Sequence, residues 1–430
     1  MTIEDIKNKG IVGAGGAGFP THIKLSSRPE YLIMNAAECE PLIHKDKALL
    51  NHYMDEVLEG FNTAMKLTGA SRGIIGIKEK HSQLIQRLRS KVHGHIQVET
   101  IGDFYPAGDE ITLIHQTVNR IPQPGSLPIT VGCLVQNVET FYNIASEKPV
   151  VDKFLTVGGA VESPLTLKVP VGTSYADLLP HFKSTAGNYK LISNGLMMGN
   201  IENDLNVVTK CTGGLILLPS DHPCITAHDR FSNPQNTVKV AKASCDQCSF
   251  CTELCPRYLL GYPVRPELAM RNRMFSYDDN TLYHAGNAFC CECNLCTLYS
   301  CPEGLDPKGA SVIEKKAAHQ KRDIWEGMPV SPHPMMSYRK VPTKKLMQRL
   351  DILQYKDTGP LGDVGIHPSS VRIPFKQHVG HPAVPVVQEG QSINRYDLIA
   401  DADGDVSAKI HASIDGRVKE ITQTDIVIQR

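Results

Sequence analysis

The chain has 430 residues, too many for one ordinary hydrophobic core, so we expect about two to four domains. Lysines plus arginines and aspartates plus glutamates number 45 each, so the chain lacks the basic excess that nucleic-acid binding requires. No apolar run is long enough to cross a bilayer and no apolar signal segment opens the sequence, so we expect a cytoplasmic protein whose clustered cysteines bind metals or serve redox chemistry.

The first distinctive segment is the glycine-rich stretch GAGGAGFPTHIK at residues 13–24, which follows a charged, helix-like start. Its glycines satisfy the G-x-G-x-x-G pattern of dinucleotide-binding folds, and Glu38 follows the last of them by 20 residues. A Rossmann site is disfavoured, because no strong strand precedes the loop and Pro20 stands where a helix must open. Successive glycine N–H groups can still cradle a phosphate, so we expect a phosphate-binding loop, with a turn that binds nothing as the alternative.

The segment over residues 151–232 predicts short strands joined by turns. Apolar residues alternate from Val157 to Val171 around a Gly-Gly pair and Pro164, as a β-hairpin would require. The stretch GGLILLP at residues 213–219 predicts one further buried strand.

Nine of the 13 cysteines lie in two runs, CDQCSFCTELCP at 245–256 and CCECNLCTLYSCP at 290–302. Three closely spaced thiolates suit one face of an iron–sulfur cube, and in two-cluster ferredoxins the fourth cysteine of each run serves the other cluster. Zinc is the alternative, but the third cysteine of each run is surplus to a pair of C-x2-C knuckles around a tetrahedral ion. The spacing therefore predicts two [4Fe–4S] clusters with exchanged fourth ligands.

The predicted ligand sets each combine both runs. We expect set one to consist of Cys245, Cys248, Cys251 and Cys301. We expect set two to consist of Cys290, Cys293, Cys296 and Cys255. The chain between the runs is helix-permissive, so the clusters are expected in an α-helical ferredoxin domain over residues 233–328.

Two segments complete the chain. Residues 329–372 are rich in proline, lysine and methionine, and predict an ordered linker or docking surface with one short helix at 343–352; a solvated, charged connector is the alternative. Residues 373–430 look like a barrel-sandwich segment of the biotinyl or lipoyl type. Its hairpin tip is Asp415-Gly416, without the lysine that such carriers need, so we expect no swinging cofactor.

Four ordered stretches resemble the NADH-binding flavoprotein of respiratory complex I and the RnfC component of the Rnf complex. They are the glycine loop, NAAECEP at 35–41, YPAGDE at 105–110 and VQNVET at 135–140. Over its whole length the chain resembles more closely the cobalamin reductase family of propanediol-utilisation microcompartments. That family has a flavin domain, a β-grasp domain, two cubane clusters and a carboxyl-terminal barrel-like segment.

The resemblance implies sites for FMN and a nicotinamide nucleotide. FMN contacts are expected from Gly13, Gly15, Gly16, Gly18, Lys24, Asn35, Glu38, Asp109, Glu110, Asn137 and Thr140. Phe19 and Glu40 match positions that help to hold the nucleotide. Four positions depart from the complex I flavoproteins, which have Arg, Asp, Cys and Asn there: Ala14, Ala37, Ala107 and Gln136. These departures affect the NADH contacts more than the flavin contacts.

The implied fold is multidomain α/β and α+β. Its parts are an FMN/NADH-binding α/β domain over 1–150, a soluble-ligand-binding β-grasp domain over 151–232, an α-helical two-cluster domain over 233–328, a linker over 329–372 and a barrel-sandwich-like β segment over 373–430. For the β-grasp domain a scaffold role is favoured over a B12 pocket.

The resemblance also implies an electron-transport oxidoreductase that passes electrons from NADH through FMN and two [4Fe–4S] clusters to cobalamin, reactivating B12 for diol dehydratase. FMN suits this task, because it accepts an electron pair and passes on single electrons, so no proton-transferring catalytic side chain is expected. Expected partners are NADH, cobalamin or a cobalamin-handling adenosyltransferase, and microcompartment shell proteins or another redox subunit. The alternatives are an NADH-oxidising, RnfC-like input subunit of a larger redox complex, and a ligand-binding or shell-docking scaffold.

Overall fold

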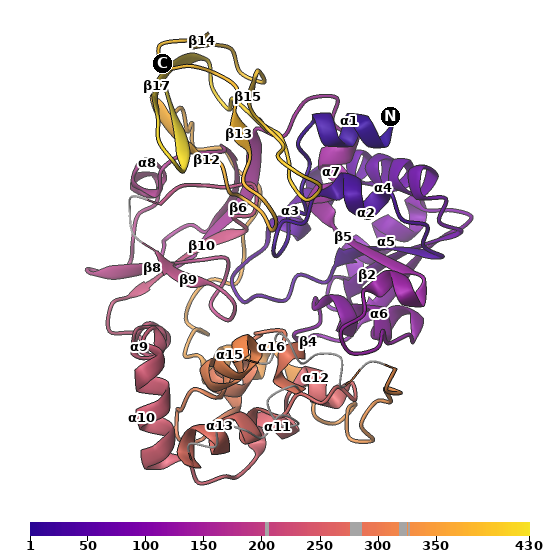
Figure 1. Ribbon diagram of the computed structural model, residues 1–430, viewed down its shortest axis with the longest axis vertical. Coiled ribbons are helices and arrows are strands. Elements are labelled where there is room, and N and C mark those ends of the chain that lie inside the picture. Colours follow the sequence, from indigo (N-terminus) through magenta and orange to yellow (C-terminus); the bar gives the residue numbers. More distant parts are fainter. Residues whose placement is uncertain (203–205, 276–285, 318–324, 326) are drawn as a thin grey trace.

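The computed structural model describes residues 1–202, 206–275, 286–317, 325 and 327–430. Figure 1 shows an amino-terminal α/β region beside a second, β-rich region, with a group of helices below both and the carboxyl-terminal strands above the β-rich region. No helix in these described ranges is long and apolar enough to span a bilayer.

A parallel four-stranded sheet forms the core of the amino-terminal region. Its strands, in spatial order, are β3 (Ile96–Ile101), β2 (Arg72–Lys78), β1 (Tyr31–Ala36) and β5 (Cys133–Asn137). Both faces are buried, as is usual for parallel sheets, since Leu32 and Met34 belong to one apolar cluster and Ile33 to another. The chain continues from β1 to β2 on one side and reaches β5 on the other, which creates a crevice at the carboxyl ends of β1 and β5.

Helices cover both faces of this sheet (Figure 1). They are α3 (Lys45–His52), α4 (Met54–Thr68), α5 (Ser82–Lys91), α6 (Glu110–Val118) and α7 (Val138–Ala145). Helices α4 and α7 touch closely at Gly60, where an added Cβ would lie 1.8 Å from the carbonyl oxygen of Phe141.

The glycine loop lies between two helices, α1 (Ile3–Asn8) and α2 (Thr21–Leu25), and no strand leads into it. This arrangement differs from a Rossmann motif, in which a strand precedes the loop. The expectation that Pro20 disrupts the following helix was wrong, however, because Pro20 is the N-cap of α2 and the helix begins directly after it. The first N–H groups of a helix have no intrahelical acceptor, so a proline here removes no helical hydrogen bond.

A mixed five-stranded sheet forms the second region. Its strands, in spatial order, are β7 (Leu165–Pro170), β6 (Asp152–Gly159), β10 (Gly214–Pro219), β8 (Tyr189–Ser193) and β9 (Asn200–Glu202). Strands β6 and β7 form the hairpin that the alternation predicted, and β10 pairs with β6 in parallel. A short helix, α8 (Tyr175–Leu178), packs against this sheet through Tyr175 and Leu178.

The regular secondary structure of the described residues from 223 to 317 consists of helices joined by loops. These are α9 (Pro223–Phe231), α10 (Pro234–Ser244), α11 (Phe250–Glu253), α12 (Pro256–Leu259), α13 (Pro266–Phe275), η3 (Asn287–Phe289), η4 (Cys296–Ser300) and α15 (Pro307–Ala317). The chain then returns to the amino-terminal region, because β11 (Val341–Pro342) pairs with β4 (Phe104–Tyr105). The helix predicted at 343–352 is present as α16 (Thr343–Arg349).

Two small sheets complete the chain around one apolar cluster. Their strands are β12 (Ser370–Pro374), β13 (Val384–Pro385), β14 (Ser392–Ile393), β15 (Leu398–Asp401), β16 (Ile410–His411), β17 (Gly416–Ile421) and β18 (Asp425–Gln429). Their spatial orders are β12-β18-β17-β14 and β13-β15-β16.

Candidate functional site

All four of the flavin-like sequence stretches meet at the crevice between β1 and β5. Asn35 and Asn137 are direct neighbours in the pairing of these strands. The Asn35 side chain donates to the Gly108 carbonyl (2.8 Å), which attaches the stretch 105–110. The Ala14 N–H donates to Thr140 Oγ1 (3.0 Å), which attaches the glycine loop. Residues from four distant segments therefore surround one site.

The glycines of the loop have different structural roles. Gly13 donates its N–H to the Phe19 carbonyl (2.9 Å), which closes the loop. An added Cβ on Gly15 would lie 3.2 Å from the Asn137 amide group. Gly16 has a φ of +77° and nothing within 4 Å of an added Cβ, so its backbone is open to an approaching group. At Gly18 the same atom would lie 2.4 Å from the sulfur of Cys211, so this glycine permits contact with the second region.

A buried ionic network supports the loop from behind. Lys45 donates to Asp46 (2.6 Å) and to Glu139 (3.1 Å), and Lys153 donates to Glu139 and to the Ala14 carbonyl (3.0 Å). Burial opposes the charge on Lys45, but Asp46 and Glu139 raise its pKa above the usual value. Because Lys153 lies near the start of β6 in the second region, the network joins that region to the glycine loop.

The two glutamates of NAAECEP face different neighbours. Glu38 accepts from the Asp46 N–H (3.2 Å), and burial and the nearby Asp46 carboxylate raise its pKa to about 7. Glu40 accepts from the N–H groups of Met197 (3.2 Å) and Met198 (3.1 Å), and burial raises its pKa to about 7. Both line a cavity of about 230 Å³. Glu40 therefore lies where the flavin region meets the second region.

The remaining residues of the predicted flavin site form ion pairs. Lys24 donates to Glu110 (3.0 Å) and to the Val135 carbonyl (3.1 Å). Asp109 caps α6 and binds Arg257 through both carboxylate oxygens (2.8 and 2.9 Å). Arg257 follows directly after the Cys-Pro pair of the first cysteine run, so this bidentate pair joins the flavin region to the helical region.

The two cysteine runs share one backbone shape. In the first run Gln247 and Ser249 have φ values of 59° and 66°. At the matching positions of the second run, Glu292 and Asn294 have values of 57° and 64°. Each such residue costs about 1 kcal/mol, since side chains other than glycine disfavour the left-handed region. The same unfavourable pair before and after the middle cysteine of both runs indicates that each backbone wraps a similar object.

The pKa of a thiol in one cysteine run is affected by thiols of both runs. Burial, and then the Glu267 carboxylate, raise the pKa of Cys251 above its usual value. Three further thiols add to this rise: Cys301, Cys248 and Cys245. Burial also raises the pKa of Cys296, and the thiols that add to it are Cys290, Cys255 and Cys251. The two groups of thiols therefore adjoin one another.

The cysteine sulfurs also receive backbone hydrogen bonds. The Glu292 N–H points to Cys290 Sγ and the Leu305 N–H to Cys301 Sγ, both at 3.4 Å. In the described part of the chain, no three histidine, cysteine, aspartate or glutamate side chains are placed to hold one metal ion. A [4Fe–4S] cube places one thiolate on each of four iron atoms, an arrangement that differs from a single shared ion.

Three family models match the chain. They are the FMN-binding domain of Nuo51 over residues 6–146, a 4Fe-4S dicluster domain over 244–306 and the RnfC barrel sandwich hybrid domain over 360–430. Curated relatives called cobalamin reductase PduS match 99% of this chain and 96% of their own length, with 36% identity in Citrobacter freundii and 37% in Salmonella typhimurium. This chain belongs to the PduS cobalamin reductase family. A subunit of the Na(+)-translocating ferredoxin:NAD(+) oxidoreductase complex of Acetobacterium woodii is 31% identical over 64% of this chain and 62% of its own.

As a member of this family, the chain is an electron-transfer oxidoreductase with FMN and two [4Fe–4S] clusters as its cofactors. The residues present fit both kinds of group. The open backbone at Gly16 leaves room that a Cβ would fill. The repeated left-handed residues and the N–H groups aimed at sulfur suit thiolates wrapped around a cube.

Sequence reasoning missed three supporting residues, Lys45, Lys153 and Arg257. The two lysines lie outside the flavin stretches, and their common partner Glu139 lies inside one of them. Arg257 had a weak signal, since a cation directly after the Cys255-Pro256 pair suggests a charged partner elsewhere. Five cysteines lie outside the predicted ligand sets. Cys133 and Cys224 are buried, whereas Cys39, Cys211 and Cys291 are partly exposed.

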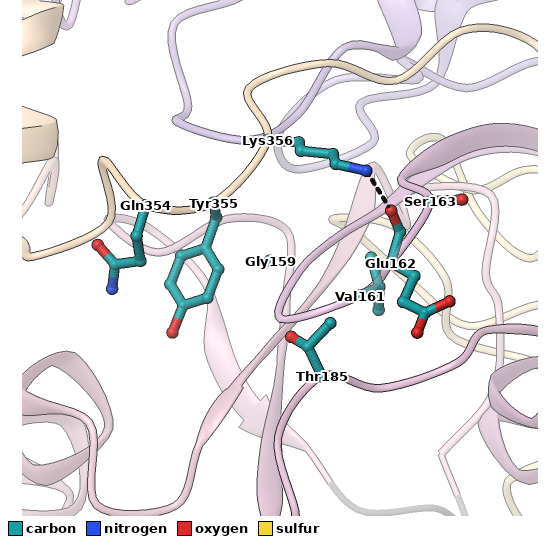
Figure 2. A pocket seen from close by; sticks show the side chains of 8 residues that line it. All are labelled: Gly159, Val161, Glu162, Ser163, Thr185, Gln354, Tyr355 and Lys356. Carbon is teal, nitrogen blue, oxygen red and sulfur yellow. Dashed lines mark hydrogen bonds between the residues drawn. The ribbon is translucent and has the colours of Figure 1, made fainter.

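A separate pocket of about 440 Å³ lies at the end of the β6–β7 hairpin. Figure 2 shows the hairpin residues Val161, Glu162 and Ser163 on one side of it and Gln354 and Tyr355 on the other. The Lys356 ammonium donates to the Glu162 carbonyl (2.7 Å) across this boundary. The contact attaches the linker to the second sheet, and none of the flavin or cluster residues lines the pocket.

Proposed function

We propose that this chain oxidises NADH at the flavin crevice and delivers single electrons to cobalamin. One geometric observation supports the electron path most directly: the flavin region touches the backbone of the second cysteine run. The hydroxyl of Tyr105, the first residue of the flavin-like stretch 105–110, donates to the Cys293 carbonyl (2.8 Å), and the Arg257–Asp109 pair lies on the same boundary. The acceptor is inferred from the whole-length similarity to cobalamin reductases.

The flavin crevice would hold FMN with its phosphate at the exposed N–H groups of the glycine loop. When bound, FMN supplies a centre that takes an electron pair from NADH and releases single electrons. Thr140 and the Lys153 ammonium keep the loop backbone in place by bonding both polar groups of Ala14. Asn35 and Asn137 position neighbouring strand ends, and Phe19 and Glu40 would contact the nucleotide. No side chain of the protein is required to move a proton.

We propose the exchanged ligand sets, because Cys301 affects the pKa of Cys251 in the first run and Cys255 affects the pKa of Cys296 in the second run. Set two lies toward the flavin, since Cys293 contacts Tyr105 through its carbonyl and Arg257 follows Cys255. Set one is more exposed, because Cys248 is exposed at the surface, whereas Cys255, Cys293 and Cys296 are buried. Electrons would therefore enter at set two and leave at set one.

We also propose the finer domain assignment of the chain, with a β-grasp domain over 151–232 that acts as a scaffold. Lys153 and Cys211 of this region lie against the glycine loop, which supports a structural role. A place inside a microcompartment, near an adenosyltransferase and shell proteins, is proposed from the PduS name of the relatives.

The decisive experiment is anaerobic turnover by reconstituted protein that contains one FMN and about eight iron atoms per chain. NADH-dependent reduction of cobalamin is expected. If the reconstituted protein oxidises NADH but leaves cobalamin oxidised, cobalamin is refuted as the electron acceptor. An Rnf-like input subunit is less well supported, because the Rnf relatives match only part of the chain. Stable co-purification with cofactor-bearing membrane subunits would favour that role.

A further inference from the structure

An open groove of about 700 Å³ lies between α11, η4 and α16, on the helical region. Its apolar lining consists of Phe250, Leu254 and Tyr299. Its cationic lining consists of Arg339, Lys345 and Arg349. We call this feature the α11–α16 groove. Its volume is in the range typical of small-molecule sites.

The groove is built on the backbone that contains set one. Phe250 stands between Cys248 and Cys251 in the first run. Ser300, which also lines the groove, directly precedes Cys301. Arg349 donates to the Cys301 carbonyl (3.1 Å), which connects α16 to the same ligand. A molecule in the groove would therefore contact the chain segments that hold three of the four set-one cysteines.

The lining combines an aromatic surface with excess positive charge. Phe250 is 49% exposed, an unusual state for a phenylalanine, and it offers a flat face to an occupant. Three cations face one carboxylate among the lining residues, and that carboxylate, Glu253, lies 3.4 Å from Arg339. Such a site suits a large, partly apolar molecule that also has an anionic group.

We propose that the α11–α16 groove binds the corrinoid acceptor, with the corrin against the aromatic lining and the phosphodiester of the nucleotide tail at Arg339 and Lys345. This inference rests on the proposed function and deepens it. In the step concerned, the cobalt of cob(II)alamin gains one electron to become Co(I), and that electron originates from NADH. The reduced corrinoid has one more negative charge than the reactant, so the cations of the groove also favour the product.

The test compares cobalamin with cobinamide, which has the corrin but lacks the phosphodiester and nucleotide. The double variant Arg339→Gln, Lys345→Gln removes two positive charges from the groove lining and leaves every cysteine unchanged. Equilibrium dialysis of the loaded protein should show a Kd for cob(II)alamin about tenfold higher than in the wild type, because charge-assisted hydrogen bonds are lost. The Kd for cobinamide should change less than about twofold. KM for cobalamin should rise in parallel, with NADH–ferricyanide activity unchanged.

Lys419→Gln is the matched control, because Lys419 is an exposed lysine on β17, outside the groove. Unchanged cobalamin binding in the double variant, or equal weakening for both corrinoids, would overturn the groove assignment. The proposed function fails separately. If the double variant weakens cobalamin binding as expected but the wild-type protein does not reduce cobalamin with NADH, cobalamin is refuted as the electron acceptor and the groove assignment stands. If the wild-type protein reduces cobalamin with NADH and the double variant binds cobalamin as tightly as the wild type, only the groove assignment is refuted.

Discussion

The two cysteine runs have nearly the same local conformation and very different surroundings. Each places left-handed residues on both sides of its middle cysteine. The middle cysteine of the second run, Cys293, is buried and contacts Tyr105 of the amino-terminal region, whereas Cys248 of the first run is exposed. Local sequence thus sets the shape of a cluster-binding loop, while its position in the fold sets its burial and its neighbours.

The largest expected effect tests the exchange of ligands between the runs. Cys301→Ala should remove the set-one cluster, so that bound iron falls from about eight to about four atoms per chain. The remaining electron paramagnetic resonance spectrum of the reduced protein should match that of Cys248→Ala and differ from that of Cys293→Ala. A match to Cys293→Ala would mean that Cys301 serves its own run.

The next effect concerns the boundary between flavin and set two. Arg257→Gln leaves Asp109 without its bidentate partner in a mostly buried site, so the free energy of unfolding should fall by about 3 kcal/mol. Urea unfolding followed by flavin and cluster absorbance measures this change. The control is Lys91→Gln, which breaks an exposed pair with Asp55 and should cost less than about 1 kcal/mol. An equal loss of unfolding free energy in both variants would show that the Arg257–Asp109 pair stabilises the fold no more than an exposed ion pair does.

The two proposed ligand sets differ in exposure, so we expect the clusters to be lost in two phases. Under anaerobic treatment with an iron chelator, about half of the cluster absorbance should disappear first, because set one has an exposed thiolate. The fast phase should be absent in Cys248→Ala, which already lacks that cluster. A single phase in the wild type would indicate equal protection of the two sets.

The smallest effect is a pH dependence at Glu40, which accepts a long hydrogen bond from Tyr105 (3.4 Å) on the set-two side. Burial raises the pKa of Glu40 to about 7 in the folded state, above the usual value of 4.5. Between these values the folded state binds more protons than the unfolded state, so stability falls as pH rises from about 4.5 to about 7. Glu40→Gln should flatten this slope in thermal unfolding. An unchanged slope would show that Glu40 is not the responsible group.

Much of the site could be predicted from motifs whose chemistry is local. The C-x2-C-x2-C spacing places three thiolates within one loop, so the run itself indicates a cluster. The glycine loop likewise indicates an open backbone, and Gly16 has one. The expectation at Pro20 was wrong because a single residue type was weighed without its position, and an N-cap tolerates proline.

The sequence by itself determined the cofactor types and the order of the parts along the chain, because each depends on residues within a few positions of one another. Only the tertiary structure decided that Tyr105 contacts the backbone of Cys293, that Lys153 secures the glycine loop, and that a cationic groove lies next to Cys301. These features join residues separated by 139 positions in the Lys153–Ala14 bond and 148 in the Arg257–Asp109 pair. Such pairs form through the packing of whole regions, which no local pattern of residues encodes.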